Sequence, residues 1–236
     1  MQEISVLNGA ALLWFVLLWL GYARFAHFKA KRSDKNLSSV MNNLRHRWMA
    51  QLLKREIRIP DAALIANLER NVTFLASTSM LILAGLLTSL AATDQIQAVL
   101  IDVPFYVESA PLLMHFKQFV LIIIYAYAFF TFSWSMRQYG FATVVIGAAP
   151  MVEDNIDEEH RTCFVRVSAK VIDLAAHTYN YGLRAFYFSL SVLAWFINDW
   201  LFIFASTLVV IVLYMREFHS RPLRELRTLA QETKDL

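Results

Sequence analysis

The chain has 236 residues, of which 58% are apolar, 14% aromatic and 17% charged. Because soluble domains carry about a quarter charged residues, this composition and the long uncharged runs exclude an ordinary soluble domain. The net charge of +3 does not indicate a nucleic-acid partner, since the basic residues lie beside apolar runs, where anionic lipid headgroups account for them. We therefore expect an all-α membrane helix bundle that forms a single domain over residues 1–236.

The first apolar run extends over residues 4–25 and is long enough for a membrane span. No Lys or Arg precedes this run and basic residues follow it, which is the reverse of the charge order in a cleaved signal peptide. We therefore expect this run to be retained as the first transmembrane helix.

Residues 26–60 are predicted to be cytosolic and to contain an amphipathic helix over residues 37–53. Its apolar residues recur at helical spacing and are Leu37, Met41, Leu44, Trp48 and Leu52. The basic residues in and just after this helix, which we expect to face lipid, are Arg45, Arg47, Lys54 and Arg55. Two interpretations remain open: the helix lies in the headgroup plane, or it packs beneath the bundle.

The second span is predicted over residues 72–92, on a helix that starts near Asp61, directly after Pro60. Small and hydrogen-bonding residues recur on one face of this helix, which is typical of helix–helix contacts in lipid. The polar residues predicted to meet the fourth span near the cytosolic boundary are Asn67, Glu69 and Asn71.

The outer loop over residues 93–111 leads to the third span, predicted over residues 113–134. The loop is too apolar to lie free in water, so we expect it to dock on the bundle or in the outer leaflet. Lys117 lies near the outer end of the third span, and we expect its long side chain to extend to the outer surface.

The fourth span is predicted over residues 175–197, and the helix that leads into it carries the most informative pattern of the chain. Polar side chains recur at steps of three and four residues, which places them on one helical face. This polar row consists of Arg166, Lys170, Asp173, His177, Asn180 and Arg184. Ionisable groups in a bilayer normally face a partner helix or a water-filled cavity, so the row is the predicted functional site. We expect Arg184 to pair with Glu69.

Asn198 and Asp199 form a turn signal that separates the fourth span from a short fifth span over residues 200–215. The alternative is one overlong helix over residues 185–215, which would give four spans. We prefer five spans, because an Asn–Asp pair buried in mid-membrane is costly.

Basic residues determine the expected orientation. The segments rich in Lys and Arg, residues 26–60 and 216–236, fall on one side together with residues 137–174, whereas the outer loop has acids and no basic residue. The positive-inside rule therefore places the C-terminus in the cytosol and the N-terminus outside, in a bacterial inner membrane.

The sequence contains no catalytic motif and no metal-site motif, so a membrane enzyme ranks third among the function classes. The acidic cluster over residues 153–159 lacks the glycine and glutamate spacing of an EF-hand, so Asp157 is predicted to cap a helix instead. The single Cys163 excludes a multi-thiolate site. His177 and His27 could lie at matching depth as haem ligands, but no further pair of histidines supports this, so we expect no haem and no other cofactor.

Four strings resemble a family of multi-pass membrane proteins from bacteria and plants, the domain of unknown function 599. These strings are RNVTFLASTS at 70–79, SWSMRQY at 133–139, NYGLRAFYF at 180–188 and LYMREFHS at 213–220. The resemblance implies a membrane fold over nearly the whole chain, but no established activity and no catalytic residues. Where relatives have a Gly-Pro turn, this chain has Asn198 and Asp199.

The excess of positive charge on the polar row suggests an oligomeric conduit or binding site for a small solute, with an anion favoured. One chain of five helices encloses little space, so we expect a homo-oligomer or a subunit of a larger membrane complex. The alternative is a membrane scaffold or accessory subunit that binds anionic lipid headgroups or a partner complex.

Overall fold

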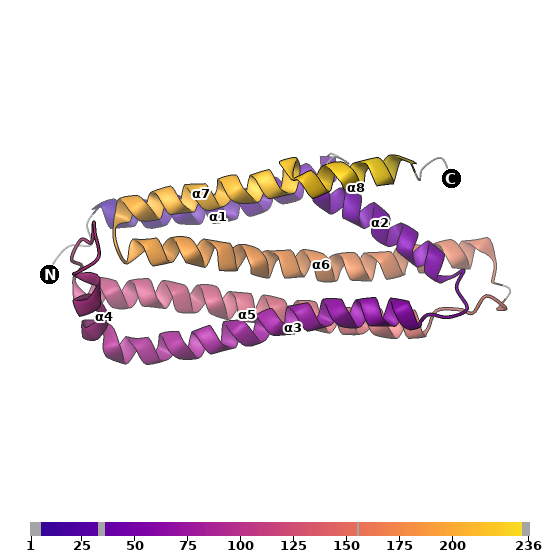
Figure 1. The fold of residues 1–236 in the computed structure, drawn as a ribbon, viewed down its shortest axis with the longest axis horizontal. Helices are drawn as coiled ribbons and strands as arrows, with labels where there is room; N and C mark the ends of the chain where they lie inside the picture. The colour runs from indigo at the N-terminus through magenta and orange to yellow at the C-terminus, as the bar shows by residue number, and fades with distance from the viewer. Residues whose placement is uncertain (1–5, 33–35, 155, 233–236) are drawn as a thin grey trace. The chain divides into compact units, whose positions relative to one another are not determined.

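The computed structural model describes residues 6–32, 36–154 and 156–232, and within these residues the helices are joined by turns and irregular segments, with no strand. This confirms the all-α prediction. The helices are α1 (Val6–Arg32), α2 (Leu37–Leu52), α3 (Ile59–Ser89), the 3-10 turn η1 (Leu90–Ala92), α4 (Thr93–Leu100), α5 (Pro111–Gly147), α6 (Glu158–Trp195), α7 (Asp199–His219) and α8 (Arg221–Glu232) (Figure 1).

Four described segments are long and apolar enough to cross a membrane, which is what a membrane protein requires. They are Val6–Ala26, Ile59–Leu100, Pro111–Gly147 and Asp199–Leu229. The predicted fourth span is not among them, because polar side chains such as Asn180 and Arg184 lower the mean hydropathy of α6. A fifth span therefore stays a prediction from the sequence.

The chain divides into two compact units. The boundary between them falls within α3, α5 and α6, so each of these helices contributes one segment to each unit. Unit 1 comprises residues 1–29, 77–129 and 182–216, and unit 2 comprises residues 30–76, 130–181 and 217–236. The polar row is divided accordingly, since Arg184 belongs to unit 1 and the row from Arg166 to Asn180 belongs to unit 2.

The core of unit 1 is aromatic. The Trp195 and Phe202 rings are stacked with centroids 4.7 Å apart, and Phe15 packs on both Phe202 and Phe188 at 5.2 Å and 5.6 Å. All four rings are almost completely buried. Large rings of this kind supply much of the packing of a helix bundle.

The turn predicted at Asn198 and Asp199 is confirmed in unit 1. Helix α6 ends at Trp195, α7 begins at Asp199, and the Asn198 side chain accepts a hydrogen bond from the Trp200 amide at 2.8 Å. The alternative of one helix over residues 185–215 is therefore wrong. The Asn198 amide oxygen stabilises the start of α7 as an N-cap residue does.

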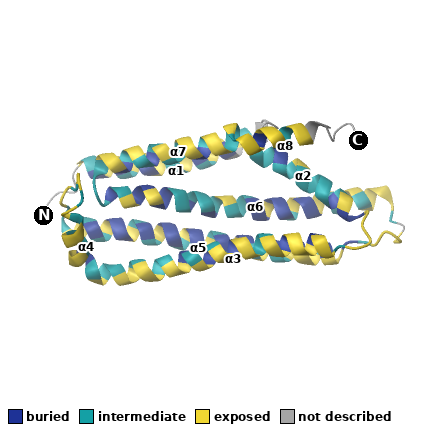
Figure 2. Cartoon of the chain, viewed as in Figure 1, coloured by how far each residue is buried: buried dark blue, intermediate teal, exposed yellow. Residues whose placement is uncertain are grey.

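The outer loop docks in unit 1 through its backbone, and its apolar side chains differ in exposure. The Val107 amide donates to the Ile197 carbonyl at 3.0 Å, but the side chains of Val99, Ile101 and Phe105 are 62–81% exposed. Figure 2 shows α4 as largely exposed. Docking on the bundle is therefore wrong for Val99 and Phe105, whereas Ile96, Leu100, Val103 and Tyr106 are partly buried. Insertion of the loop into the outer leaflet stays a prediction.

In unit 2, α2 has one buried face and packs against α8. Val40, Met49 and Leu52 are at most 3% exposed, and Asn36 caps the helix by accepting from the Ser39 amide at 2.7 Å. Of the two interpretations of residues 37–53, the structure therefore favours the helix packed on its own protein.

The predicted cap at Asp157 is also confirmed. Its carboxylate accepts a hydrogen bond from the His160 amide at 2.8 Å, directly before α6 begins at Glu158. The acidic cluster therefore serves the start of α6, where carboxylates also complement the helix dipole.

Candidate functional site

Asp173 lies at the centre of a charged cluster in unit 2. Its side chain is 1% exposed, and one carboxylate oxygen accepts from the Arg45 guanidinium at 2.8 Å. The other oxygen lies 3.5 Å from each of three nitrogens, on Lys170, His177 and Asn42. Residues from α2 and α6 thus converge on one buried carboxylate, although Arg45 and Asp173 are 128 residues apart in sequence.

The surroundings of Asp173 keep it ionised. Burial raises the pKa of this carboxyl, but the hydrogen bond from His177 and the charges of His177, Arg45 and Lys170 together lower the pKa below its usual range. A buried carboxylate held in this way needs its cations, because removing one partner leaves an uncompensated charge.

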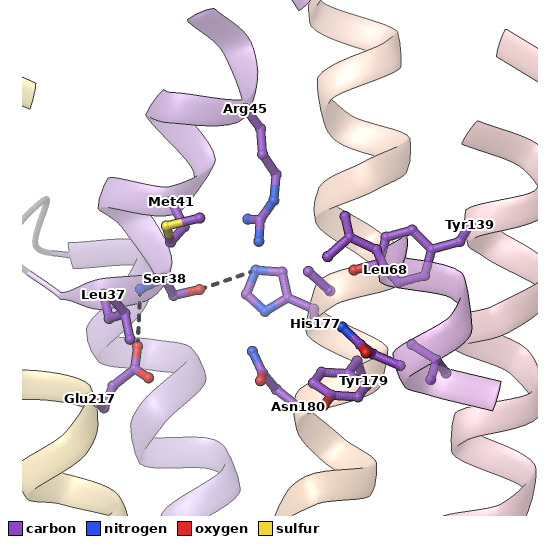
Figure 3. Close-up of a pocket in the computed structure, with 13 residues that line it drawn as sticks. Leu37, Ser38, Met41, Arg45, Leu68, Tyr139, His177, Tyr179, Asn180 and Glu217 are labelled. Atoms are coloured by element: carbon purple, nitrogen blue, oxygen red, sulfur yellow. Dashed lines mark hydrogen bonds between the residues drawn. The ribbon is translucent and has the colours of Figure 1, made fainter. Parts of the chain in front are cut away.

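A cavity of about 300 Å³ lies beside this cluster, within unit 2. Figure 3 shows the Arg45 guanidinium, the His177 ring and the Asn180 amide pointing toward the same space. The residues lining the cavity come from five helices and are Leu37, Ser38, Met41, Arg45, Leu68, Asn71, Val72, Tyr139, Ala176, His177, Tyr179, Asn180 and Glu217. Polar groups from α2, α3, α5, α6 and α7 can therefore contact one small ligand.

Ser38 of α2 makes two hydrogen-bond contacts at the cavity, one with α6 and one with α7. The Ser38 hydroxyl lies 3.4 Å from Nε2 of His177, and the Ser38 backbone amide donates to the Glu217 carboxylate at 3.2 Å (Figure 3). Nε2 of His177 thus lies near both the Ser38 hydroxyl and the Asp173 carboxylate. The imidazole adds a positive charge to the cavity only when it is protonated.

The structure separates the predicted row into lining and non-lining residues. His177 and Asn180 line the cavity, whereas Arg166 and Lys170 are exposed, and the Arg166 guanidinium lies 3.9 Å from the Cys163 sulfur. Lys170 reaches the site only through Asp173.

The three polar residues predicted on the second span also have different positions. Asn71 lines the same cavity as Asn180, Asn67 is exposed, and Glu69 lines a different cavity together with Trp134 and Arg137 of α5. Within unit 2, Asn71 therefore lies at the same cavity as His177 and Asn180 of the polar row, and Glu69 does not line that cavity.

Arg184 belongs to unit 1, where its guanidinium lies 5.4 Å from the centre of the Tyr22 ring. This distance permits a cation–π interaction. Glu69 belongs to unit 2. The proposed pairing of Arg184 with Glu69 therefore stays a prediction.

Two of the four basic residues expected to face lipid are held by acids of unit 2. Arg45 pairs with Asp173 and its side chain is 16% exposed, so the prediction that it faces lipid is replaced by an internal ion pair. Arg55 pairs with the fully buried Asp61 at 2.5 Å, although its own side chain is 44% exposed. Lipid contact by Arg47 and Lys54 stays a prediction.

The sequence did not predict that the charged side chains of Asp61 and Lys117 are buried. Asp61 is fully buried and also accepts from the Trp48 indole at 2.6 Å, and Lys117 is 2% exposed in unit 1. The expectation that Lys117 extends to the outer surface is therefore wrong. Neither residue lies in a motif, but each stands in a largely apolar stretch, where a charge requires a partner.

Among the described residues, no three His, Cys, Asp or Glu side chains gather closely enough to hold a metal ion. The sequence model of a family described as "Protein of unknown function, DUF599" matches residues 10–222. No curated protein and no solved structure matches the chain.

Proposed function

Because the chain belongs to the DUF599 family, whose description assigns no activity, we propose a function from the geometry of the site. We propose that this membrane protein binds a small solute with an anionic group in the cavity beside α6. The observation that carries the proposal is the convergence of Arg45, Lys170 and His177 on the buried Asp173 at the edge of that cavity.

The charges around the cavity favour an anion when His177 is protonated. Asp173 offsets one of the two permanent cations, Arg45 and Lys170, and Glu217 on the α7 wall offsets the other. A proton on His177 then leaves one excess positive charge beside the empty space. Asn71 and Asn180 offer side-chain amides that can donate further hydrogen bonds to a bound anion.

The size and lining of the cavity limit the ligand. Its volume of about 300 Å³ is at the lower end of the usual range for ligand pockets. Polar atoms from Ser38, Tyr139 and Asn180 line it beside apolar ones. A small polar ion such as a carboxylate or phosphate suits this space better than an acyl chain.

We also propose that several copies assemble so that the site belongs to a path across the bacterial inner membrane. The assembly is supported by the small space that one chain of five helices encloses, and the orientation by the basic segments, which favour a cytosolic C-terminus. Labelling of a cysteine introduced at Asp102, after Cys163→Ser, tests this orientation. Reaction only from the outside is expected, and reaction only from the cytosolic side would reverse it.

The test of binding uses purified full-length protein with inorganic phosphate, acetate and chloride as separate probes. We expect at least one anion to bind, because Arg45, His177 and two side-chain amides line the cavity. His177→Gln removes an ionisable donor from the lining and should weaken that binding, whereas His46→Gln, outside the cavity lining, should not. Absence of binding for all three probes would refute the proposal.

Flux distinguishes a conduit from a binding site. Protein reconstituted in vesicles should release the bound anion down its gradient if the site belongs to a path, and His177→Gln should alter that release. Binding without flux would retain the site and remove the conduit.

A scaffold is the second candidate, and exposed basic residues of unit 2 favour it. Lys54 follows α2, and Arg221 and Arg224 lie on α8, which packs against α2. Such a surface suits anionic headgroups. Protein that binds none of the three anions, but whose retention of anionic lipid falls after Arg221→Gln and Arg224→Gln, would favour this role.

A further inference from the structure

Unit 1 contains a second cavity, of about 730 Å³, which has no role in the proposed function. It is lined by the start of α1, by the segment before α5, by the first turns of α5 and by the turn between α6 and α7. Apolar side chains such as Leu113 and Phe116 make up most of the wall, and charged groups are confined to Lys117, Glu108 and Asp199, apart from His115.

Lys117 is the buried cation of this cavity. Its ammonium donates to the Trp195 carbonyl at 2.8 Å and to the Ser109 hydroxyl at 3.2 Å, and it lies 5.6 Å from the centre of the Trp195 ring. An ammonium has three N–H donors, and these two acceptors are neutral. The hydrogen-bond acceptors of Lys117 are therefore dipoles, the Asp199 carboxylate attracts the ammonium without a direct hydrogen bond, and a third donor remains for a ligand with negative charge.

Two acids lie in the same wall. One Asp199 carboxylate oxygen accepts from the Trp195 indole at 2.8 Å, and the same indole also donates to Asn8 at 3.2 Å. The Glu108 side chain is exposed at the cavity. The cavity therefore offers one cation and two carboxylates, which fits a ligand that carries both signs of charge better than a simple anion.

Two apolar residues that line the cavity are also exposed on the surface of α5. Leu112 is 77% exposed, Phe119 is 53% exposed, and both stand at the start of a helix that can cross a membrane. Exposed apolar residues on such a helix contact acyl chains in a bilayer. The ligand should therefore combine acyl chains with a doubly charged head.

We propose that this cavity binds a zwitterionic phospholipid whose head carries a primary ammonium. Its phosphate accepts from Lys117, its ammonium donates to Asp199 and Glu108, and its acyl chains lie along Leu112 and Phe119. A primary ammonium supplies N–H donors to the two carboxylates, whereas the quaternary ammonium of a choline head supplies none. A head with only negative charge would lie beside both carboxylates without a cation of its own.

The test measures lipids retained by the full-length protein. Detergent-purified protein is mixed with phospholipids that have identical acyl chains and ethanolamine, choline or glycerol heads, and bound lipid is counted by native mass spectrometry. Wild-type protein should retain the ethanolamine lipid roughly tenfold better than the choline lipid, as expected if one charge-assisted hydrogen bond is worth about a factor of ten. Soluble phosphoethanolamine should compete poorly, because it has no acyl chains.

Matched variants identify the groups responsible. Asp199→Asn should reduce the preference for ethanolamine over choline to about twofold or less, whereas Asp94→Asn on the exposed start of α4 should leave it unchanged. Lys117→Met should lower retention of all three phospholipids, and Lys29→Met, outside the cavity, should not. Equal retention of the three heads by wild-type protein would overturn the proposal, as would a preference that survives Asp199→Asn.

Discussion

The two cavities show two ways of keeping a charge inside a helical protein. In unit 2 the buried Asp173 is surrounded by Arg45, Lys170 and His177, so its charge is balanced by other charges. In unit 1 the buried Lys117 is held mainly by the Trp195 carbonyl and the Ser109 hydroxyl, which are neutral. In unit 2, loss of either Arg45 or Asp173 leaves the other member of their ion pair as an uncompensated charge. In unit 1, removal of the lysine charge leaves two neutral acceptors without their donor, and Asp199 loses a nearby cation but keeps its hydrogen bond from the Trp195 indole, so the two sites should respond differently to substitution.

The largest effect is expected for Asp173→Ala. This change leaves the mostly buried Arg45 without its partner, and loss of one member of a buried pair costs about 3–5 kcal/mol of stability. Thermal unfolding in detergent should show it.

A double variant checks the cause. Arg45→Met combined with Asp173→Ala should be less destabilised than the sum of the single variants, because the second change removes the stranded charge. Strict additivity would show that the pair does not contribute to stability.

A smaller loss is expected for Lys117→Met. The substitution keeps the long apolar stem but leaves the Trp195 carbonyl without its donor, which costs about 1–3 kcal/mol. The same unfolding assay should therefore rank this variant above Asp173→Ala in stability. A loss as large as that of Asp173→Ala would contradict the distinction between the two cavities.

The difference between the sites also marks what the sequence could predict. Helical periodicity placed Asp173 and His177 on one face, and local signals identified the Asp157 cap and the Asn198 turn, because these features depend on neighbours in sequence. Periodicity says which face is polar but does not identify the partner on another helix. Arg45 was therefore predicted to face lipid, because its partner Asp173 lies 128 residues away in the sequence.

Lys117 was misjudged for a related reason. A lysine near the end of a span usually extends to water, and no local pattern distinguishes such a lysine from one held by a distant carbonyl. The acceptor on Trp195 is 78 residues away, at a helix end whose carbonyls lack helical partners. Identification of this contact requires the packing of α5 against α6 within unit 1.

Acid should weaken unit 2 through Asp173. Because the pKa of this carboxyl is lower in the folded protein, its stabilisation is fully present above the ordinary carboxyl range and is lost as pH falls through the lowered pKa. Stability measured from neutral to acidic pH should thus fall less steeply in Asp173→Asn, which has no charge to lose. Parallel curves for wild type and variant would assign the acid sensitivity to other groups.

The smallest effect is expected at Asp157, an exposed acid that lies outside both cavities. Its pKa is lowered first by the hydrogen bond from the His160 amide, and then by the hydrogen bond to the His160 side chain and by the charge of that ring. The cap therefore acts above the ordinary carboxyl range and weakens as the carboxylate gains a proton in acid. Asp157→Ala should speed amide hydrogen exchange in the first turn of α6, from Glu158 to Arg161, and leave exchange around Asp173 unchanged, because loss of a cap frays only the adjoining turn. Asp157→Asn should restore most of the protection at neutral pH, since its amide oxygen still accepts from the backbone. If exchange around Asp173 rose equally in Asp157→Ala, the cap and the buried ion pair would form one cooperative element, and the ion pair could not be treated as a separate site.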